Sequence, residues 1–347
     1  MPLEATIVPR PPYSLALSAR MKSDATRVFR DGVLTIAFQV DDRPLLARVR
    51  QRPDGSLAAR IDGVAGAAAL EHLRFVLAAD DDHQPFLHRF GRDPLLGAAT
   101  RRLRGLRPLR TATVTHALLK AVCGQLIQAR TARTLEARLL RRRGVSHGDL
   151  QLPPTRETFG VLAPAQLARD GLVARKATAL VRLSREWDVE RLRGVETGPA
   201  ATRIERERGL GPWSAGMICL HGLGRYERGL VGDLGLIKLC AALRGRPADV
   251  DDTRELLEPY VEWAGLASVY LLAGGGASDE RPFRRRKTPT AAEATPSNAR
   301  SHSGRPVNGR SSRGAAGAIA GSAERWTTGA GSSPPAALPP PASASGS

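Results

Sequence analysis

The feature that most constrains this chain is a tight glycine turn, Gly209-Leu210-Gly211, set between two helical patterns. Residues 200–207 contain no helix breaker, and residues 213–220 carry apolar side chains at helical spacing. We expect both glycines to be needed, because the chain must reverse here with positive φ and a backbone without side chains can then approach another backbone closely. The amide groups of such a turn, followed by a helix N-terminus, form a donor surface that suits a phosphate.

An acidic residue follows this turn along the chain. Asp233 stands directly before another helical pattern, with the apolar Leu236 and the basic Lys238 following it. Taken alone, a Gly-x-Gly sequence is an ordinary turn, and an aspartate before a helix is most often an N-cap. Each feature alone therefore favours this ordinary interpretation, and only their order and spacing indicate more.

The stretch from 205 to 238 resembles the hairpin and catalytic segment of the helix-hairpin-helix DNA glycosylase superfamily. In that family a Gly-hydrophobic-Gly hairpin binds a DNA phosphate, and the aspartate that follows is catalytic. The resemblance implies that Asp233 is the catalytic carboxylate and that DNA is bound by Gly209, Leu210 and Gly211.

The same resemblance implies an ion site at the hairpin. Family members coordinate a monovalent cation there through backbone carbonyls, and the matching positions are Glu205, Glu207 and Leu210. Because the ligands are carbonyl oxygens, the two glutamate side chains are expected to point away from the DNA. No other cofactor is expected to be required.

A second segment, Gly124-Gln125-Leu126-Ile127-Gln128, lies upstream between two helical patterns. It resembles the GQ-hydrophobic segment of the family's alkylation-repair branch, in which the apolar residue enters the duplex where the target base has left. The resemblance implies that Leu126 is this wedge and that Gln125 lies beside it at the DNA. Extruding a base leaves a hole that an apolar side chain can fill. The alternative is that Leu126 belongs to the core.

The position before Ser214-Ala215 bears on the type of reaction. Family members that also cut the DNA backbone carry a Schiff-base lysine there, whereas this chain has Trp213. Without an amine no imine can form, so a monofunctional enzyme is expected. Trp213 is expected to stack on the extruded base through its π face, and Met217 to form a second wall of the base pocket. The alternative for Trp213 is a core position.

Charge balance favours a polyanionic partner. The 347 residues include 52 Lys plus Arg against 34 Asp plus Glu, a net charge of +18. Such a positive field attracts nucleic acid first, although a GC-rich coding sequence also enriches arginine.

The three cysteines are spaced too widely for a zinc site, an iron–sulfur run or a disulfide framework and are expected to be core thiols. No apolar run reaches membrane-spanning length and residues 1–19 lack a signal-peptide pattern, so we expect a cytoplasmic protein without membrane contact. We further expect a monomer that associates with the nucleoid.

The chain is expected to be mainly α-helical, a two-lobed helical bundle with a helix-hairpin-helix motif, preceded by a small α/β domain. The predicted domains are 1–82 (α/β), 83–276 (helical) and 277–347 (a disordered basic tail rich in Ser, Pro, Gly and Ala). The tail is expected either to hold DNA non-specifically or to act only as a solubilising extension.

Predicted strands cover 33–40, 45–50 and 57–61, with a helix at 66–77. Predicted helices follow at 113–122, 131–142, 164–170, 175–185, 252–257 and 260–272, with a short one from Asp93 and a polar connector at 145–158.

The best hypothesis from the sequence is a monofunctional DNA glycosylase of base excision repair acting on damaged duplex DNA. Its expected substrates are alkylated purines, 3-methyladenine and 7-methylguanine, which already carry positive charge and leave without a strong acid. One carboxylate then suffices to stabilise the sugar cation. Two alternatives stay open: a glycosylase for oxidised or deaminated bases, and a non-catalytic module that uses the hairpin only to bind DNA.

Overall fold

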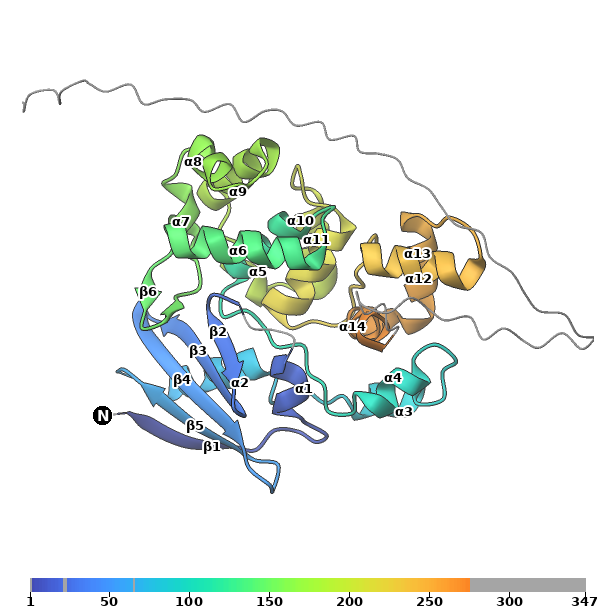
Figure 1. Cartoon of the computed structure of the whole chain (residues 1–347), viewed down its shortest axis with the longest axis horizontal. Helices are drawn as coiled ribbons and strands as arrows, with labels where there is room; N and C mark the ends of the chain where they lie inside the picture. Colours follow the sequence, from blue (N-terminus) through green and yellow to red (C-terminus); the bar gives the residue numbers. More distant parts are fainter. Residues whose placement is uncertain (1, 21–23, 65, 275–347) are drawn as a thin grey trace, which may run out of the picture. The chain divides into compact units, whose positions relative to one another are not determined.

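The computed structural model describes residues 2–20, 24–64 and 66–274 (Figure 1). The predicted tail therefore lies outside the described residues. The N-terminal part is a five-stranded antiparallel sheet with the strand order β1-β5-β4-β3-β2. The strands are β1 (Leu3–Ile7), β2 (Arg27–Arg30), β3 (Val33–Val40), β4 (Arg43–Gln51) and β5 (Leu57–Asp62), accompanied by the helices α1 (Leu15–Arg20) and α2 (Ala67–Leu77).

The three predicted strands and the helix at 66–77 are confirmed within one or two residues. The Asp31-Gly32 turn joins β2 to β3 with φ angles of 51° and 75°, as expected for a two-residue hairpin loop. Apolar residues of the sheet and of α2 form one hydrophobic cluster, which also includes Leu109. The edge strands β1 and β2 were not predicted. β1 pairs with the distant β5 (Leu3 opposite Ile61), and no local turn marks that pairing.

Helices make up most of the remaining described chain. They are α3 (Gln84–Phe90), α4 (Gly97–Arg102), α5 (Val114–Gly124), α6 (Ala129–Arg143), α7 (Arg156–Gly160), α8 (Pro164–Arg169), α9 (Ala174–Glu186), α10 (Thr197–Glu205), α11 (Pro212–Ile218), α12 (Leu234–Arg244), α13 (Val250–Leu257) and α14 (Ala264–Gly274). Short helices of other pitch are η1 (Val189–Gly194), η2 (Cys219–Leu223) and η3 (Glu258–Trp263), and β6 (Ser146–His147) pairs with β7 (Leu150–Gln151). The mainly helical fold with a small N-terminal sheet is confirmed.

Three local predictions need correction. The helix expected from Asp93 begins at Gly97, because the Asp93 carboxylate accepts the amide hydrogens of Leu95 and Leu96 and forms a turn first. The connector at 145–158 contains the β6–β7 ribbon and the start of α7. The last helix begins at Ala264, since Val261 has non-helical φ and ψ angles of 12° and −84°.

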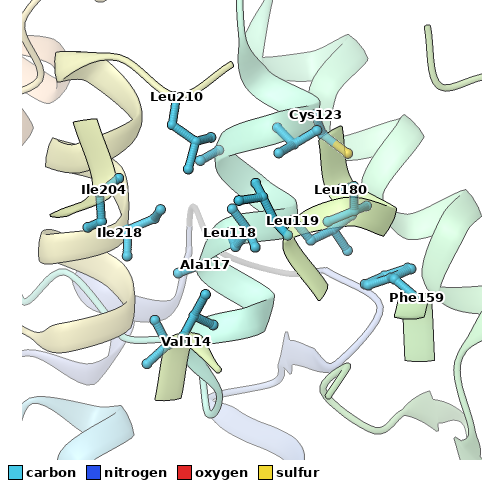
Figure 2. Close-up of a cluster of buried hydrophobic side chains, with 14 of the residues drawn as sticks. Val114, Ala117, Leu118, Leu119, Cys123, Phe159, Leu180, Ile204, Leu210 and Ile218 are labelled. Carbon is cyan, nitrogen blue, oxygen red and sulfur yellow. The ribbon is translucent and has the colours of Figure 1, made fainter. Parts of the chain in front are cut away.

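The helices enclose two hydrophobic clusters. The first, which we call the α5 cluster, is formed mainly by α5, α6, α9, α10 and α11. Figure 2 shows Leu210 from the glycine turn directed into this cluster together with α5 side chains. The second, the α14 cluster, contains residues of α3, α12 and α14. Trp213 and Met217 are partly buried and pack against both clusters.

The three cysteines are buried, which confirms them as core thiols, and burial raises the pKa of Cys219 to about 12. Among the described residues, no helix is both long enough and apolar enough to span a bilayer.

A buried ionic cluster joins the N-terminal part to the helices. The Lys120 ammonium on α5 lies 3.2 Å from the Asp24 carboxylate and 2.7 Å from the Glu136 carboxylate of α6. Arg27 completes the pairing of Asp24, and His116 contacts Glu136 through Nε2. Because Asp24 precedes β2, this cluster fixes the edge of the sheet against α5 and α6.

Candidate active site

The glycine turn connects α10 to α11 and forms the predicted hairpin. Gly209 has a φ angle of 96°, a left-handed conformation that favours glycine. Leu210 is buried, and its amide donates to the Glu207 carbonyl at 2.9 Å, so this residue anchors the turn from the inside. Gly211 differs from the prediction. Its φ of −124° and ψ of −172° are extended values that any residue adopts, and open space surrounds the position of a Cβ. Only the first glycine is therefore required by conformation.

The two hairpin glutamates point to arginines. Glu207 pairs with Arg203 at 2.9 Å and Arg182 at 3.3 Å, and Glu205 lies 3.8 Å from Arg228. Their carboxylates are thus committed to these ion pairs. The Glu207 carbonyl accepts the Leu210 amide and retains a second lone pair. A cation at the hairpin would accordingly be held by backbone carbonyls alone.

Asp233 is half-buried and caps α12. Its Oδ1 accepts the Gly235 amide hydrogen at 2.8 Å, the ordinary bond of an N-cap aspartate. Its Oδ2 accepts the indole Nε1–H of Trp213 at 3.0 Å. The carboxylate is therefore held by one donor from its own helix and one from α11, which follows the hairpin.

Close backbone contacts hold the segment that leads to Asp233. A Cβ on Gly216 of α11 would lie 2.4 Å from the Gly229 carbonyl oxygen, so only glycine permits this approach. The Leu230 amide donates to Ser268 Oγ of α14 at 3.1 Å, and the Gly232 amide to Thr253 Oγ1 of α13 at 2.8 Å. Three helices thereby fix where the carboxylate lies.

Trp213 lies between Asp233 and α5. A Cβ on Gly124 would be 2.6 Å from the indole Cη2, so the ring edge packs against glycine at the end of α5. Sequence reasoning missed the Trp213–Asp233 hydrogen bond, because nothing in the spacing of two residues on separate helices indicates it. The Trp213 ring is partly exposed. Like Met217, it packs against both the α5 cluster and the α14 cluster.

Two surface hollows lie away from these residues. One is lined by Val145 and Thr158 among others, and the second by Trp187 and Arg203 among others; Asp233 and Trp213 line neither. A base pocket beside Trp213 is therefore a prediction for the DNA-bound protein.

Leu126 is exposed at the tip of a turn. Its side chain is 81% exposed, so it is not a core residue. Gln125 has φ −56° and ψ 124°, Leu126 has φ 57°, and the Ile127 amide faces the Gly124 carbonyl at 3.5 Å. These values describe a type II turn with leucine at the position that ordinarily selects glycine or asparagine. An apolar side chain in a strained backbone conformation at the surface is typical of a functional position.

We expect Leu126→Gly to lower base release without lowering the thermal stability of the protein. Glycine relieves a left-handed strain of about 1 kcal/mol and exposes no new core, so the melting temperature should stay the same or rise slightly. Duplex distortion and base release should fall at least about tenfold, because the gap in the stack is no longer filled. Thermal melting and single-turnover base release check the two effects. A loss of stability like that of a buried leucine, about 3 kcal/mol, would contradict the exposed position.

Gln125 lies against the hairpin. Its Nε2 donates to the Gly209 carbonyl at 2.7 Å and to Ser214 Oγ at 3.1 Å, while Lys176 Nζ of α9 donates to the Gln125 carbonyl at 2.7 Å. The amide nitrogen of Gln125 is thus used within the protein, and a direct contact of this residue with DNA stays a prediction. The structure brings the predicted wedge turn, the hairpin and Trp213 together around these bonds.

Comparison with known proteins supports the resemblance found in the sequence. A DNA-3-methyladenine glycosylase of Bacillus subtilis is 28% identical over 203 residues, which cover 55% of this chain and 67% of the relative. The Mycobacterium tuberculosis "Probable bifunctional transcriptional activator/DNA repair enzyme AlkA" is 29% identical over 208 residues, 58% of this chain and 42% of that relative. The chain thus spans less than half of the second protein. No family model matches the chain.

Solved structures share the fold. The 3-methyladenine DNA glycosylase of Archaeoglobus fulgidus aligns with a TM-score of 0.68 at 21% identity, covering 78% of this chain and 97% of its own. The 8-oxoguanine glycosylase/lyase of Clostridium acetobutylicum, solved with double-stranded DNA, aligns with a TM-score of 0.64 at 14% identity, covering 77% and 93%. The hairpin, the aspartate and the helical framework occur together in this chain, and both curated relatives carry names of DNA repair proteins. The chain is therefore similar in sequence to a DNA-3-methyladenine glycosylase and a probable DNA repair enzyme AlkA, and it shares the fold of solved DNA glycosylases.

Proposed function

We propose that this protein is a monofunctional DNA glycosylase that releases alkylated purines, 3-methyladenine and 7-methylguanine, from duplex DNA and leaves an abasic site. The observation that carries the proposal is the Asp233 carboxylate at the N-terminus of α12, held by an indole at the position where lyase relatives carry lysine. The name of the Bacillus subtilis relative, a DNA-3-methyladenine glycosylase, supports the same class of substrate. We infer that the helical part has two lobes and that Asp233 acts at the junction of the α5 and α14 clusters. We also infer that the protein acts as a monomer on nucleoid DNA.

The carboxylate acts by charge. Breaking an N-glycosidic bond develops positive charge on the deoxyribose, and a carboxylate fixed beside C1′ stabilises that charge without reorganising. Both oxygens of Asp233 already accept a hydrogen bond, which orients the group before DNA arrives. Each oxygen keeps a lone pair, so the carboxylate is also able to orient a water for attack on the sugar.

Other residues bind the DNA and hold the target nucleotide out of the duplex. Hairpin amides around Gly209 and Gly211 bind a phosphate of the damaged strand, and Leu126 fills the gap that the extruded nucleotide leaves. Trp213 and Met217 border the extruded base. A monovalent cation at the hairpin, held by the carbonyls of Glu205, Glu207 and Leu210, would neutralise part of the phosphate charge. The turn allows this, since the neighbouring carboxylates are paired with arginines.

Trp213→Phe tests whether the indole N–H matters as well as the ring. Phenylalanine keeps an aromatic face beside the base but removes the donor to Asp233 Oδ2. Hydrogen bonds to charged groups contribute about 1.5–3 kcal/mol, so the single-turnover rate of base release should fall about 10-fold or more while duplex binding is retained. An unchanged rate would show that Trp213 acts only by stacking or packing.

The function itself is tested by incubating the protein with methylated duplex DNA and separating released bases by chromatography. We expect free 3-methyladenine and 7-methylguanine, with strands that break only after alkali, because no amine is placed at position 213 to form an imine. Parallel duplexes containing 8-oxoguanine or deaminated bases test the second enzymatic candidate. Tight duplex binding without release of any base would instead support the non-catalytic module.

A further inference from the structure

The turn that carries Leu126 needs support from outside itself. Leucine at a positive φ of 57° is disfavoured, and the exposed side chain contributes little burial to offset that cost. The Ile127 amide is 3.5 Å from the Gly124 carbonyl, a long bond that closes the turn only weakly. A wedge held this way would relax unless other groups fixed its conformation.

Gln125 supplies one such contact from the same turn. Its Nε2 is 2.7 Å from the Gly209 carbonyl and 3.1 Å from Ser214 Oγ, so a single amide bridges the hairpin turn and the first turn of α11. Ser214 is 2% exposed, which keeps this part of the bridge away from water. The bonds join segments that are 84 and 89 residues apart in the sequence.

Lys176 supplies the other contact. Its ammonium donates to the Gln125 carbonyl at 2.7 Å from α9, and it is partly buried there. This bond fixes the peptide between Gln125 and Leu126, whose orientation defines the turn type. The wedge turn is therefore held at its backbone by α9 and at its side chain by the hairpin.

We propose that Gln125 and Lys176 are positioning residues that make the Leu126 turn and the Gly209 hairpin one rigid unit on DNA. The inference deepens the proposed function and rests on it. The hairpin fixes a phosphate of the damaged strand, whereas Leu126 fills the gap in the stack. The extruded nucleotide stays out only if the distance between these two points is fixed. The Gln125 amide sets that distance through the Gly209 carbonyl.

The test uses Gln125→Met, which keeps the length of the side chain and removes both donors, in the full-length protein. Gln128→Met is the matched control, because Gln128 lies three residues later, is exposed and makes no capping bond with its side chain. Base extrusion is followed by the fluorescence of 2-aminopurine placed at the target position, and base release is followed in single turnover. We expect Gln125→Met to lower both about tenfold, the control to match wild type, and melting temperatures to agree.

A double-mutant cycle with Leu126→Ala separates positioning from general structure. If Gln125 acts by placing Leu126, then Gln125→Met should have little further effect on 2-aminopurine fluorescence in the Leu126→Ala background. Lys176→Met should reproduce the loss, and Lys176→Arg, which keeps a donor to the Gln125 carbonyl, should restore most of it. Additive effects in the cycle, or a Gln125→Met variant indistinguishable from Gln128→Met, would overturn the inference. Should wild type release no base at all, the fluorescence cycle still decides the coupling, while the proposed glycosylase activity alone would fail.

Discussion

Replacing Asp233 with asparagine should lower the single-turnover rate of base release from methylated duplex by about 1000-fold, an increase of ~4 kcal/mol in the activation free energy. Asparagine has the same shape and keeps an oxygen for the Gly235 amide, so the cap of α12 survives. It removes the negative charge that faces the sugar. The NH2 group of asparagine would face the Trp213 N–H, so two donors would meet and the hydrogen bond would be lost. This should lower the free energy of unfolding by about 1–3 kcal/mol.

Asp249→Asn is the matched control for this variant. Asp249 caps α13 just as Asp233 caps α12, accepting the amides of Asp251 and Asp252. It should release base at the wild-type rate. Binding of both variants to undamaged duplex should be close to wild type, because the hairpin and the wedge are unchanged. Base release by Asp233→Asn at the wild-type rate would remove this carboxylate from the chemistry.

The largest effect on stability is expected for Lys120→Met. The Asp24 and Glu136 side chains are only 5% and 4% exposed, and Lys120 is a shared counter-ion of both. Methionine fills the space but leaves two buried carboxylates with Arg27 and His116 as remaining partners. Breaking a buried ionic group in this way costs about 3–5 kcal/mol. Urea unfolding at pH 7 measures the loss, with the exposed Lys238→Met as control.

The pH dependence of that loss has a definite sign. Burial opposes ionisation of Asp24 and Glu136, but Lys120, together with Arg27 at Asp24 and His116 at both groups, outweighs burial and lowers the pKa of both carboxyl groups. In wild type their contribution is present above their unfolded pKa values and is lost as the pH falls through the lower folded values. Without Lys120, burial should raise these pKa values, so protonation at pH 5 should relieve the variant. We therefore expect a smaller difference between variant and wild type at pH 5 than at pH 7. An equal difference at both values would contradict the role of the buried charge.

Local chemistry explains which features the sequence predicted. The strand at 33–40 was predicted directly after Asp31-Gly32, two residues that tolerate the successive positive φ angles of a hairpin loop, although β2 on the other side of that loop was not predicted. Asp233 before an apolar pattern predicted the cap of α12, and the residues around Gly209 predicted the hairpin between α10 and α11. Each of these depends on neighbours within a few positions.

Features that depend on distant partners were not predictable in the same way. β1 is defined by its pairing with β5, and the orientation of the Asp233 carboxylate is defined by an indole 20 residues away on another helix. Glycine was expected to be needed at both positions of the turn, but the chain has a positive φ at Gly209, and Gly211 is extended with open space around the position of a Cβ. The exposure of Leu126 likewise required the fold, because periodicity does not separate an exposed leucine from a core leucine in a short segment.

The central claim is that Asp233 places negative charge against a deoxyribose that becomes positive. It is tested most directly by comparing the affinity for two duplexes, one with a positively charged pyrrolidine and one with a neutral tetrahydrofuran in place of the target nucleotide. A ring that carries the charge of the transition state should bind wild type at least about 100-fold more tightly than the neutral ring, and Asp233→Asn should lose most of that preference. If wild type and Asp233→Asn show the same ratio of affinities for the two duplexes, the carboxylate does not face the sugar and the account is wrong.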